Sequence, residues 1–200
     1  PIPNGVTYTN AVIVTGKVNR LLALQQRKLL LSEDAGDSYR QLNTIDVGSE
    51  LAANKKWAYS WNINLNNAIY RIDTLSDEVT VNELNAPSGV EKIIAIGVSE
   101  NNLEQVALID DKGNVFHSYD AGLNWYSGLV KSLPLGDSTL YAASFAQDNL
   151  SSVVVGVMKK GVLVHKPNQG WQQSTGFPAD KTNMFKVVYS PADSQVVYAQ

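Results

Sequence analysis

Apolar residues in this chain gather in short runs that are separated by polar, turn-forming residues. The runs are rich in β-branched and aromatic side chains, and glycine, proline, asparagine or aspartate residues bound them. Most runs are too short for a helix and suit strands that end in tight turns. The pattern therefore predicts an all-β protein, with strands at 12–15, 20–24, 28–31, 93–98, 106–109, 140–145, 153–158 and 185–189.

One stretch also fits a helix. Leucines recur through residues 18–31 at positions that one face of a helix would share. The repeat frame described next places residues 20–24 and 28–31 as the two middle strands of a repeat, and we favour the strands.

An eight-residue pattern occurs twice, at residues 32–39 and 118–125. Both copies read Ser-x-Asp-x-Gly-x-x-aromatic. They begin 86 residues apart, which is two repeats of 43 residues, and a unit of four short strands takes about 40–45 residues. The residues of the pattern are Ser32, Asp34, Gly36 and Tyr39 in the first copy and Ser118, Asp120, Gly122 and Trp125 in the second.

These residues resemble the Asp-box, or BNR repeat, of sialidases, sortilin-like receptors, some endoglucanases and photosystem assembly factors. The resemblance implies a β-propeller whose blades are four-stranded sheets. It also implies a structural role for the box: the Asp accepts hydrogen bonds from turn amides, the Gly takes a positive φ, and the aromatic residue is buried between blades. Ala35 and Ala121, after each Asp, need only be small. No catalytic residue is assigned.

The repeat frame predicts a single propeller domain, or a fragment of one, over residues 1–200. Trp171 marks a third, decayed box in this frame. About four and a half blades belong to a larger ring of six to ten blades, and further sequence or another subunit supplies the rest, because the apolar edge at 196–199 needs a cover. The units are 8–46, 51–88, 91–133, 138–178 and the start of a fifth at 184–200.

Candidate ligand-binding residues lie in the second unit. Trp57, Tyr59 and Trp61 alternate along one strand and share a face, which suits either packing between blades or an aromatic platform for a sugar or peptide. Arg71 lies in a Tyr-Arg-Ile sequence that resembles a sialidase carboxylate-binding motif. Asp73 stands where that motif has proline, so we favour a chance likeness.

Composition excludes several classes of function. The net charge is −3, and its 16 basic and 19 acidic residues are scattered, which gives no footprint for nucleic acid. No apolar run is long enough to span a bilayer, so membrane insertion is not expected. The chain has no cysteine and no carboxylate pattern beside His117 and His165, so neither a metal nor a cofactor is predicted, and both histidines are expected at a solvent edge or stacked on a ring.

Two functions remain open. The first is a non-catalytic binding or assembly platform that recognises a protein or glycan through a propeller face. The alternative is a glycoside hydrolase of the sialidase-like or endoglucanase-like kind, whose remaining catalytic carboxylates lie outside this chain. The chain begins at Pro1 without an initiator methionine, which suggests a processed or truncated product. An extracellular or periplasmic location is expected.

Overall fold

The computed structural model describes residues 10–13, 16–42, 46–63, 67–175, 177, 186–190 and 195–199, with only the backbone given for 10–13. Over these residues the secondary structure consists of β-strands joined by turns and loops. Within the described segments, no helix has the length and apolar character that a membrane crossing requires. The chain divides into two compact units, residues 1–86 and 87–200, and each is considered by itself.

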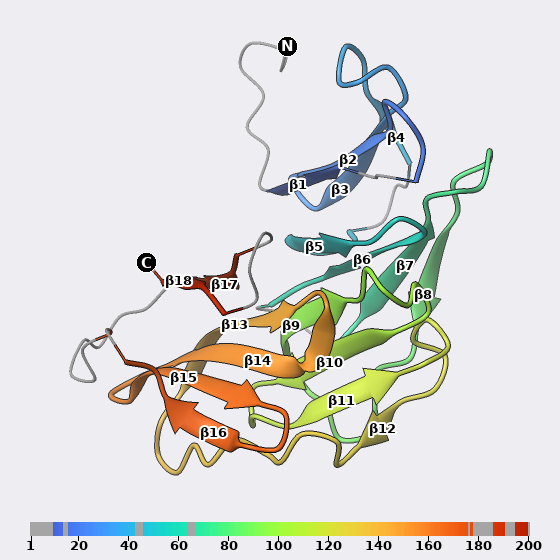
Figure 1. The fold of residues 1–200 in the computed structure, drawn as a ribbon. Helices are drawn as coiled ribbons and strands as arrows, with labels where there is room; N and C mark the ends of the chain where they lie inside the picture. Colours follow the sequence, from blue (N-terminus) through green and yellow to red (C-terminus); the bar gives the residue numbers. More distant parts are fainter. Residues whose placement is uncertain are drawn as a thin grey trace. The chain divides into compact units, whose positions relative to one another are not determined.

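Unit 1 contains two four-stranded antiparallel sheets in which sequential strands are neighbours (Figure 1). The β2–β3 hairpin turns at Gln26 and Arg27, which both have a positive φ. The first sheet consists of β1 (Asn10–Ile13), β2 (Leu21–Gln25), β3 (Lys28–Ser32) and β4 (Arg40–Gln41). The second consists of β5 (Glu50–Ala53), β6 (Trp57–Trp61), β7 (Ile69–Asp73) and β8 (Val81–Leu84).

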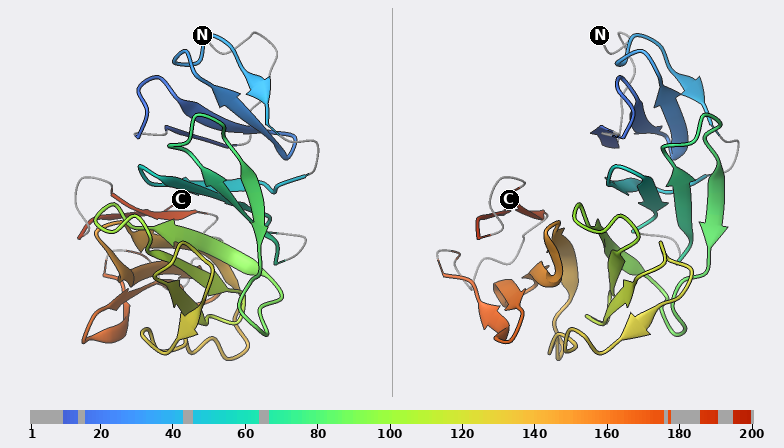
Figure 2. Two further views of the ribbon diagram at one scale, coloured as in Figure 1. Left: turned by 90° about the vertical axis from the view of Figure 1, so that its right-hand side faces the viewer. Right: turned by 45° about the vertical axis from the view of Figure 1, so that its right-hand side comes forward.

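Unit 2 repeats this arrangement, and the separate sheets are visible in the right-hand view of Figure 2. Its first sheet consists of β9 (Ile93–Val98), β10 (Val106–Asp110), β11 (Val115–Ser118) and β12 (Tyr126–Ser127). Its second consists of β13 (Leu140–Ala146), β14 (Asn149–Val157), β15 (Gly161–Lys166) and β16 (Gly170–Gln173). A further pair comprises β17 (Val187–Tyr189) and β18 (Val197–Ala199).

Burial falls from the first strands of a sheet to the last. Every residue of β9 and β10 is buried, whereas both residues of β12 are exposed. A strand buried on both sides needs a neighbouring sheet against each face, and β9 indeed contacts β13 of the next sheet. Gly97 permits this approach, because a Cβ atom there would lie 2.4 Å from the Cβ of Phe145. Sequential, face-packed sheets are the construction that the sequence predicts.

The all-β fold and the four-stranded repeats are confirmed. Three of the four-stranded sheets fall within a predicted repeat range, and the β5–β8 sheet begins one residue before its range, at Glu50. Residues 21–25 and 28–32 are strands, so the helical interpretation of that stretch is excluded. The assignment of residues 1–200 to one domain stays a prediction.

The predicted third box is wrong. In place of an eight-residue box loop, β15 and β16 are joined by a tight hairpin in which Lys166 pairs with Gly170. Trp171 lies on β16 opposite His165, and the residue opposite His117 in the preceding sheet is Tyr126, so Trp171 does not match Trp125. The 46-residue spacing between the two tryptophans is therefore not a repeat of the box.

Burial of the box aromatics was also overestimated from the sequence. Tyr39, Trp125 and Trp171 are each partly exposed. All three lie at or beside the outermost strand of a sheet, which is the least covered part of this fold.

Candidate functional site

The second Asp-box forms a closed hydrogen-bonded turn between β11 and β12. The Ser118 hydroxyl donates to Asp120 Oδ1 at 2.7 Å and accepts from the Gly122 amide at 2.8 Å. Asp120 also accepts from the backbone amide of Asn124 at 2.9 Å and from its side chain at 2.7 Å. The carboxylate thus holds its own turn together, in the way that Asx-type turns do.

The first box repeats this geometry between β3 and β4. The Ser32 hydroxyl donates to Asp34 at 2.7 Å and accepts from the Gly36 amide at 2.8 Å. Asp34 accepts from the Ser38 amide at 2.9 Å and from the Ser38 hydroxyl. The predicted hydrogen bonds from turn amides to both aspartates are present.

Hydrogen bonding keeps both box carboxylates ionised at neutral pH. The hydroxyl and amide of Ser38, with the Ser32 hydroxyl, lower the pKa of Asp34 to about 2. Burial raises the pKa of Asp120, but hydrogen bonds from Asn124 and Ser118 outweigh it and hold that pKa below its ordinary value. A permanently charged acceptor fits a structural role in the turn.

The alanine after each Asp has a conformational role in addition to being small. Ala35 and Ala121 adopt left-handed conformations, with φ of 59° and 57°. The Ala121 amide donates to the Glu104 carbonyl at 2.8 Å, and the Ala35 amide donates to the Asn19 carbonyl at 2.8 Å. Each box loop is thereby fastened to the loop between the first two strands of its own sheet. Small size alone, as expected from the sequence, does not describe this position.

In the β5–β8 sheet, the loop after the third strand is hydrogen-bonded to the loop between the first two strands without an Asp-box. Thr74 donates to the Lys56 carbonyl through both its amide, at 2.9 Å, and its hydroxyl, at 2.7 Å. Asp73 shapes the turn by accepting from the amides of Leu75 and Ser76. A different sequence therefore fastens the equivalent loop.

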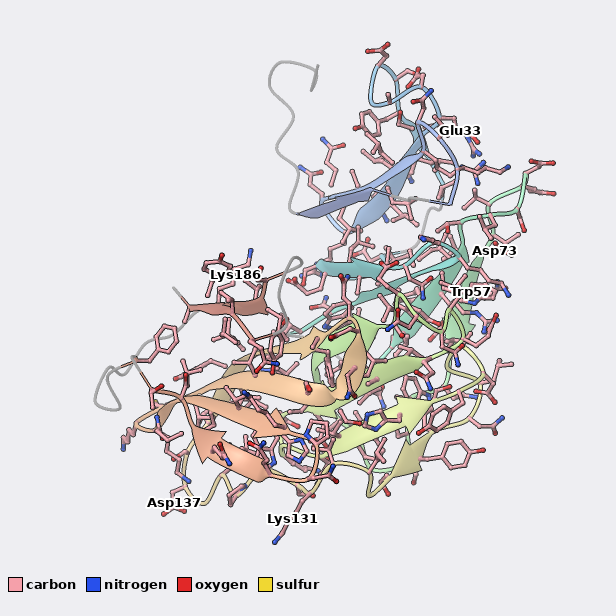
Figure 3. The ribbon with its side chains drawn as sticks, viewed as in Figure 1. Glu33, Trp57, Asp73, Lys131, Asp137 and Lys186 are labelled. Atoms are coloured by element: carbon pink, nitrogen blue, oxygen red, sulfur yellow. The ribbon has the colours of Figure 1, made fainter. Side chains whose placement is uncertain are left out.

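The aromatic strand predicted as a ligand platform is β6 of unit 1. Tyr59 and Trp61 are buried, with 1% and 5% of their surface exposed, and they belong to the core. Trp57 is partly exposed and lies opposite Asp73, as Figure 3 shows. The Arg71 guanidinium carbon lies 4.4 Å from the Trp57 ring centre, so Trp57 and Arg71 are the members of the predicted set that a ligand could reach. Ligand binding there stays a prediction.

Sequence reasoning missed a surface on unit 2 that consists of Tyr119, Leu123, Tyr126 and Leu129. We call it the aromatic surface. Between 50% and 62% of each side chain is exposed, and the Tyr119 and Tyr126 rings lie 6.2 Å apart, centre to centre. Nine large apolar side chains are exposed among the described residues, and four of them fall within residues 119–129.

A signal for this surface does exist in the sequence. Tyr119 and Leu123 occupy two unspecified positions of the second box, and the first box has Glu33 and Asp37 there. These positions are exposed in both boxes, so charged residues are the ordinary choice and apolar ones require a reason. Comparing the two boxes position by position would have found it.

A pocket of about 140 Å³ lies beside the aromatic surface, between β11 and β14. Ser118 and Leu150 are buried lining residues, whereas Tyr119, Leu129 and Asp148 line it from exposed positions. Asp148 belongs to the turn that joins β13 to β14. Unit 2 thus places an apolar surface and a small polar pocket side by side.

The two histidines lie near this pocket. His117 lines it and is 96% buried, because only 4% of its surface is exposed, so the expectation of a solvent-edge position is wrong for it. Its Nε2 atom lies 3.2 Å from the Leu150 carbonyl, and burial lowers its pKa, so the ring is neutral at pH 7 and Nε2 carries the hydrogen. His165 stacks edge-on against Trp171 at 5.2 Å, as expected.

No metal site emerges from the part of the chain that the structure describes. No three His, Asp or Glu side chains lie together there as a metal ion would require. Among the acidic residues that a hydrolase could use, Asp46 is paired with Lys28 at 2.7 Å, and Asp180 lies outside the described residues.

Comparison with known proteins supplies one relative in sequence and several in structure. No protein-family model matches the chain. The dispase autolysis-inducing protein of Streptomyces mobaraensis is 31% identical over 199 residues, which cover 97% of this chain and 51% of that protein. The chain thus spans about half the length of this curated relative.

The solved structures that resemble this chain share its construction. An ancestral GH74 enzyme matches with a TM-score of 0.63 at 13% identity, over 94% of this chain and 28% of the enzyme. A YCF48 structure, bound to D1 peptide, matches with a TM-score of 0.62 at 12% identity, over 96% of this chain and 60% of YCF48. Both are propellers of the Asp-box type.

This chain has the fold of an Asp-box β-propeller. Because the Asp-box propeller fold is found in a hydrolase and in a peptide-bound protein alike, the fold alone does not select a function. The function has to be inferred from the surface of this particular Asp-box propeller.

Proposed function

We propose that this chain is a non-catalytic platform that binds a protein partner through the aromatic surface of unit 2. The observation that carries the proposal is the exposure of Tyr119, Leu123, Tyr126 and Leu129 within one short segment. Exposed apolar patches on soluble proteins mark interaction sites, and tyrosine supplies a large contact area at a low cost in conformational entropy.

Hydrogen bonds hold the loop that presents Tyr119 and Leu123 in one conformation. Tyr119 and Leu123 flank Asp120 and Gly122 in a turn closed by short hydrogen bonds, and the Ala121 amide fastens that turn to the β9–β10 loop. A preorganised loop loses little conformational entropy on binding, so more of the contact energy remains as affinity. The Asp-box would thus serve binding indirectly, by presenting its two apolar neighbours.

The comparisons support a polypeptide as the partner. The relative from Streptomyces mobaraensis is named for inducing autolysis of dispase, and YCF48 has been solved with a bound peptide. We therefore take a protease of the dispase kind as the first partner to test. We place the protein outside the cytoplasm, in keeping with the predicted extracellular or periplasmic location. Immunodetection in the culture supernatant or periplasmic fraction tests that location.

The test of function is a binding titration of dispase against the immobilised chain. Tyr119→Ser combined with Tyr126→Ser should weaken binding by about tenfold or more, since central aromatic side chains contribute most to such interfaces. Tyr198→Ser is the matched control, because Tyr198 is 58% exposed but lies on β18, and it should bind like the wild type. Circular dichroism should show all three proteins equally folded.

Three outcomes bear against the proposal. Absence of dispase binding rules out the protease as partner, and unchanged binding by the double variant removes the aromatic surface from the interface. Hydrolysis of β-glucans or sialosides by the purified chain, lost in Arg71→Ala with folding intact, would favour the glycoside hydrolase instead.

A further inference from the structure

We propose that the pocket between β11 and β14 receives one basic side chain, lysine or arginine, from the bound polypeptide. The inference rests on the proposed function, because it specifies what part of a protein partner enters unit 2 beside the aromatic surface. It adds a charge preference that the aromatic surface alone does not give.

The size of the pocket suits a single side chain. Its volume is about 140 Å³, and a cavity of roughly 150 Å³ holds one benzene molecule. Leu129 and Tyr119, both half exposed, provide apolar walls at the side of the aromatic surface. The methylene stem of lysine or arginine packs well on such walls while its charged end reaches for polar groups.

The charge of the pocket is negative. Asp148 lines it, and among the described residues its carboxylate has no ion-pair partner. His117 also lines the pocket, and its ring is neutral at pH 7. No lysine or arginine lines this pocket, so a cation from a partner would meet an uncompensated carboxylate.

A basic side chain of the adjoining pocket is already engaged in a hydrogen bond. Lys166 lines the adjoining pocket, which Asp148 also borders, but its ammonium group donates to Gln195 at 2.9 Å. The ring of Tyr119 adds a second attraction for a cation, since aromatic faces carry negative potential. An acidic side chain would be repelled here, and a neutral one would leave Asp148 unpaired.

The first experiment selects peptides from a phage library of random twelve-residue sequences on the immobilised full chain. Arginine and lysine should be enriched in peptides selected by the wild type, and Asp148→Asn should abolish that enrichment. Asp137→Asn is the matched control, because it removes an exposed carboxylate of the same unit that does not line the pocket; Asp137 is labelled in Figure 3. The control should select the same peptides as the wild type.

The second experiment measures the affinity of the most enriched peptide by fluorescence polarisation, beside a version in which each arginine or lysine in turn becomes citrulline or norleucine. One such replacement should weaken binding to the wild type by about fivefold at low salt, the upper end for an exposed ion pair. The same replacement should change the affinity of Asp148→Asn less than about threefold.

The outcomes separate the two proposals. Equal affinity for the charged and neutral peptides, with binding lost in the Tyr119→Ser, Tyr126→Ser variant, would overturn the basic-residue pocket and keep the polypeptide platform. If neither dispase nor any of the peptides binds, both the polypeptide platform and the basic-residue pocket are overturned. Displacement of a bound peptide by a neutral oligosaccharide, unaffected by Asp148→Asn, would assign the pocket to a glycan and overturn the inference.

Discussion

Two alanines in the box turns adopt backbone conformations that L-residues usually avoid, and they differ in burial. Ala35 and Ala121 have nearly equal φ, but Ala35 is exposed and Ala121 is 1% exposed. A β-branched residue in this conformation costs about 1–2 kcal/mol through steric strain. Substitutions at these two alanines therefore measure the cost of backbone strain and the cost of overpacking separately.

We expect Ala121→Val to lower the free energy of unfolding by about 2–4 kcal/mol, because strain and overpacking add. Ala35→Val should lower it by about 1–2 kcal/mol through strain alone. Urea denaturation of the two variants measures both values. Equal losses at the two positions would contradict the difference in packing.

A pH prediction follows from Asp34. Its pKa is lowered from 3.8 to about 2 in the folded protein, so the carboxylate stabilises the fold above its unfolded pKa. That stabilisation is lost as the pH falls from 3.8 towards 2. Asp34→Asn, which cannot titrate, should therefore melt at a lower temperature than the wild type at pH 7, and the gap should narrow at pH 2. A gap that is constant with pH, in melting curves followed by circular dichroism, would contradict this account.

At the residue scale the sequence predicts the box turns well, because a short motif determines local hydrogen bonds. It does not predict that Tyr59 and Trp61 are core residues while Tyr119 is half exposed. Both sets are aromatic, and their exposure depends on which sheets cover them. The contrast between Glu33 and Tyr119 at one box position was the available clue.

At the scale of elements, Arg20 joins the two sheets of unit 1. It precedes β2 and is 3% exposed, and its guanidinium donates to the carbonyls of Thr74 and Ser76 at 2.7 and 2.8 Å. It also forms an ion pair with Glu33 of the first box. One side chain thus connects the β1–β4 sheet to the β7–β8 loop.

Arg20→Met should lower the free energy of unfolding by about 2–3 kcal/mol, since it leaves buried carbonyls without donors. Arg27→Met is the control, because Arg27 is 45% exposed and its pairing with Asp46 spans 3.9 Å. Arg27→Met should lower the free energy of unfolding by less than about 0.5 kcal/mol. Chemical denaturation tests both, and similar losses would mean that Arg20 is not a connection between the sheets.

Strands and hairpins were predictable at this scale because apolar runs and turn residues are local signals. Contacts between sheets were not. Two such contacts are Gly97 with Phe145 and Arg20 with Thr74. Each joins positions far apart in the chain, and the local sequence does not predict either. The hairpin at Trp171 was missed for a different reason, because one tryptophan spacing does not identify a loop type.

At the scale of the whole molecule, function depends on surface chemistry rather than on fold. The same construction occurs in GH74 enzymes and in YCF48, and this chain spans about half of its curated relative. What distinguishes unit 2 is an apolar segment beside a pocket whose one carboxylate, Asp148, has no ion-pair partner among the described residues. A partner that binds through this surface should therefore leave a footprint confined to a few segments.

Hydrogen–deuterium exchange of the chain with and without dispase measures that footprint directly. We predict slower exchange in residues 117–129 and 147–151 of the complex, with the aromatic strand Trp57–Trp61 unchanged. Protection confined to the Trp57–Trp61 region, or no protection at all when dispase is in excess, would contradict the account.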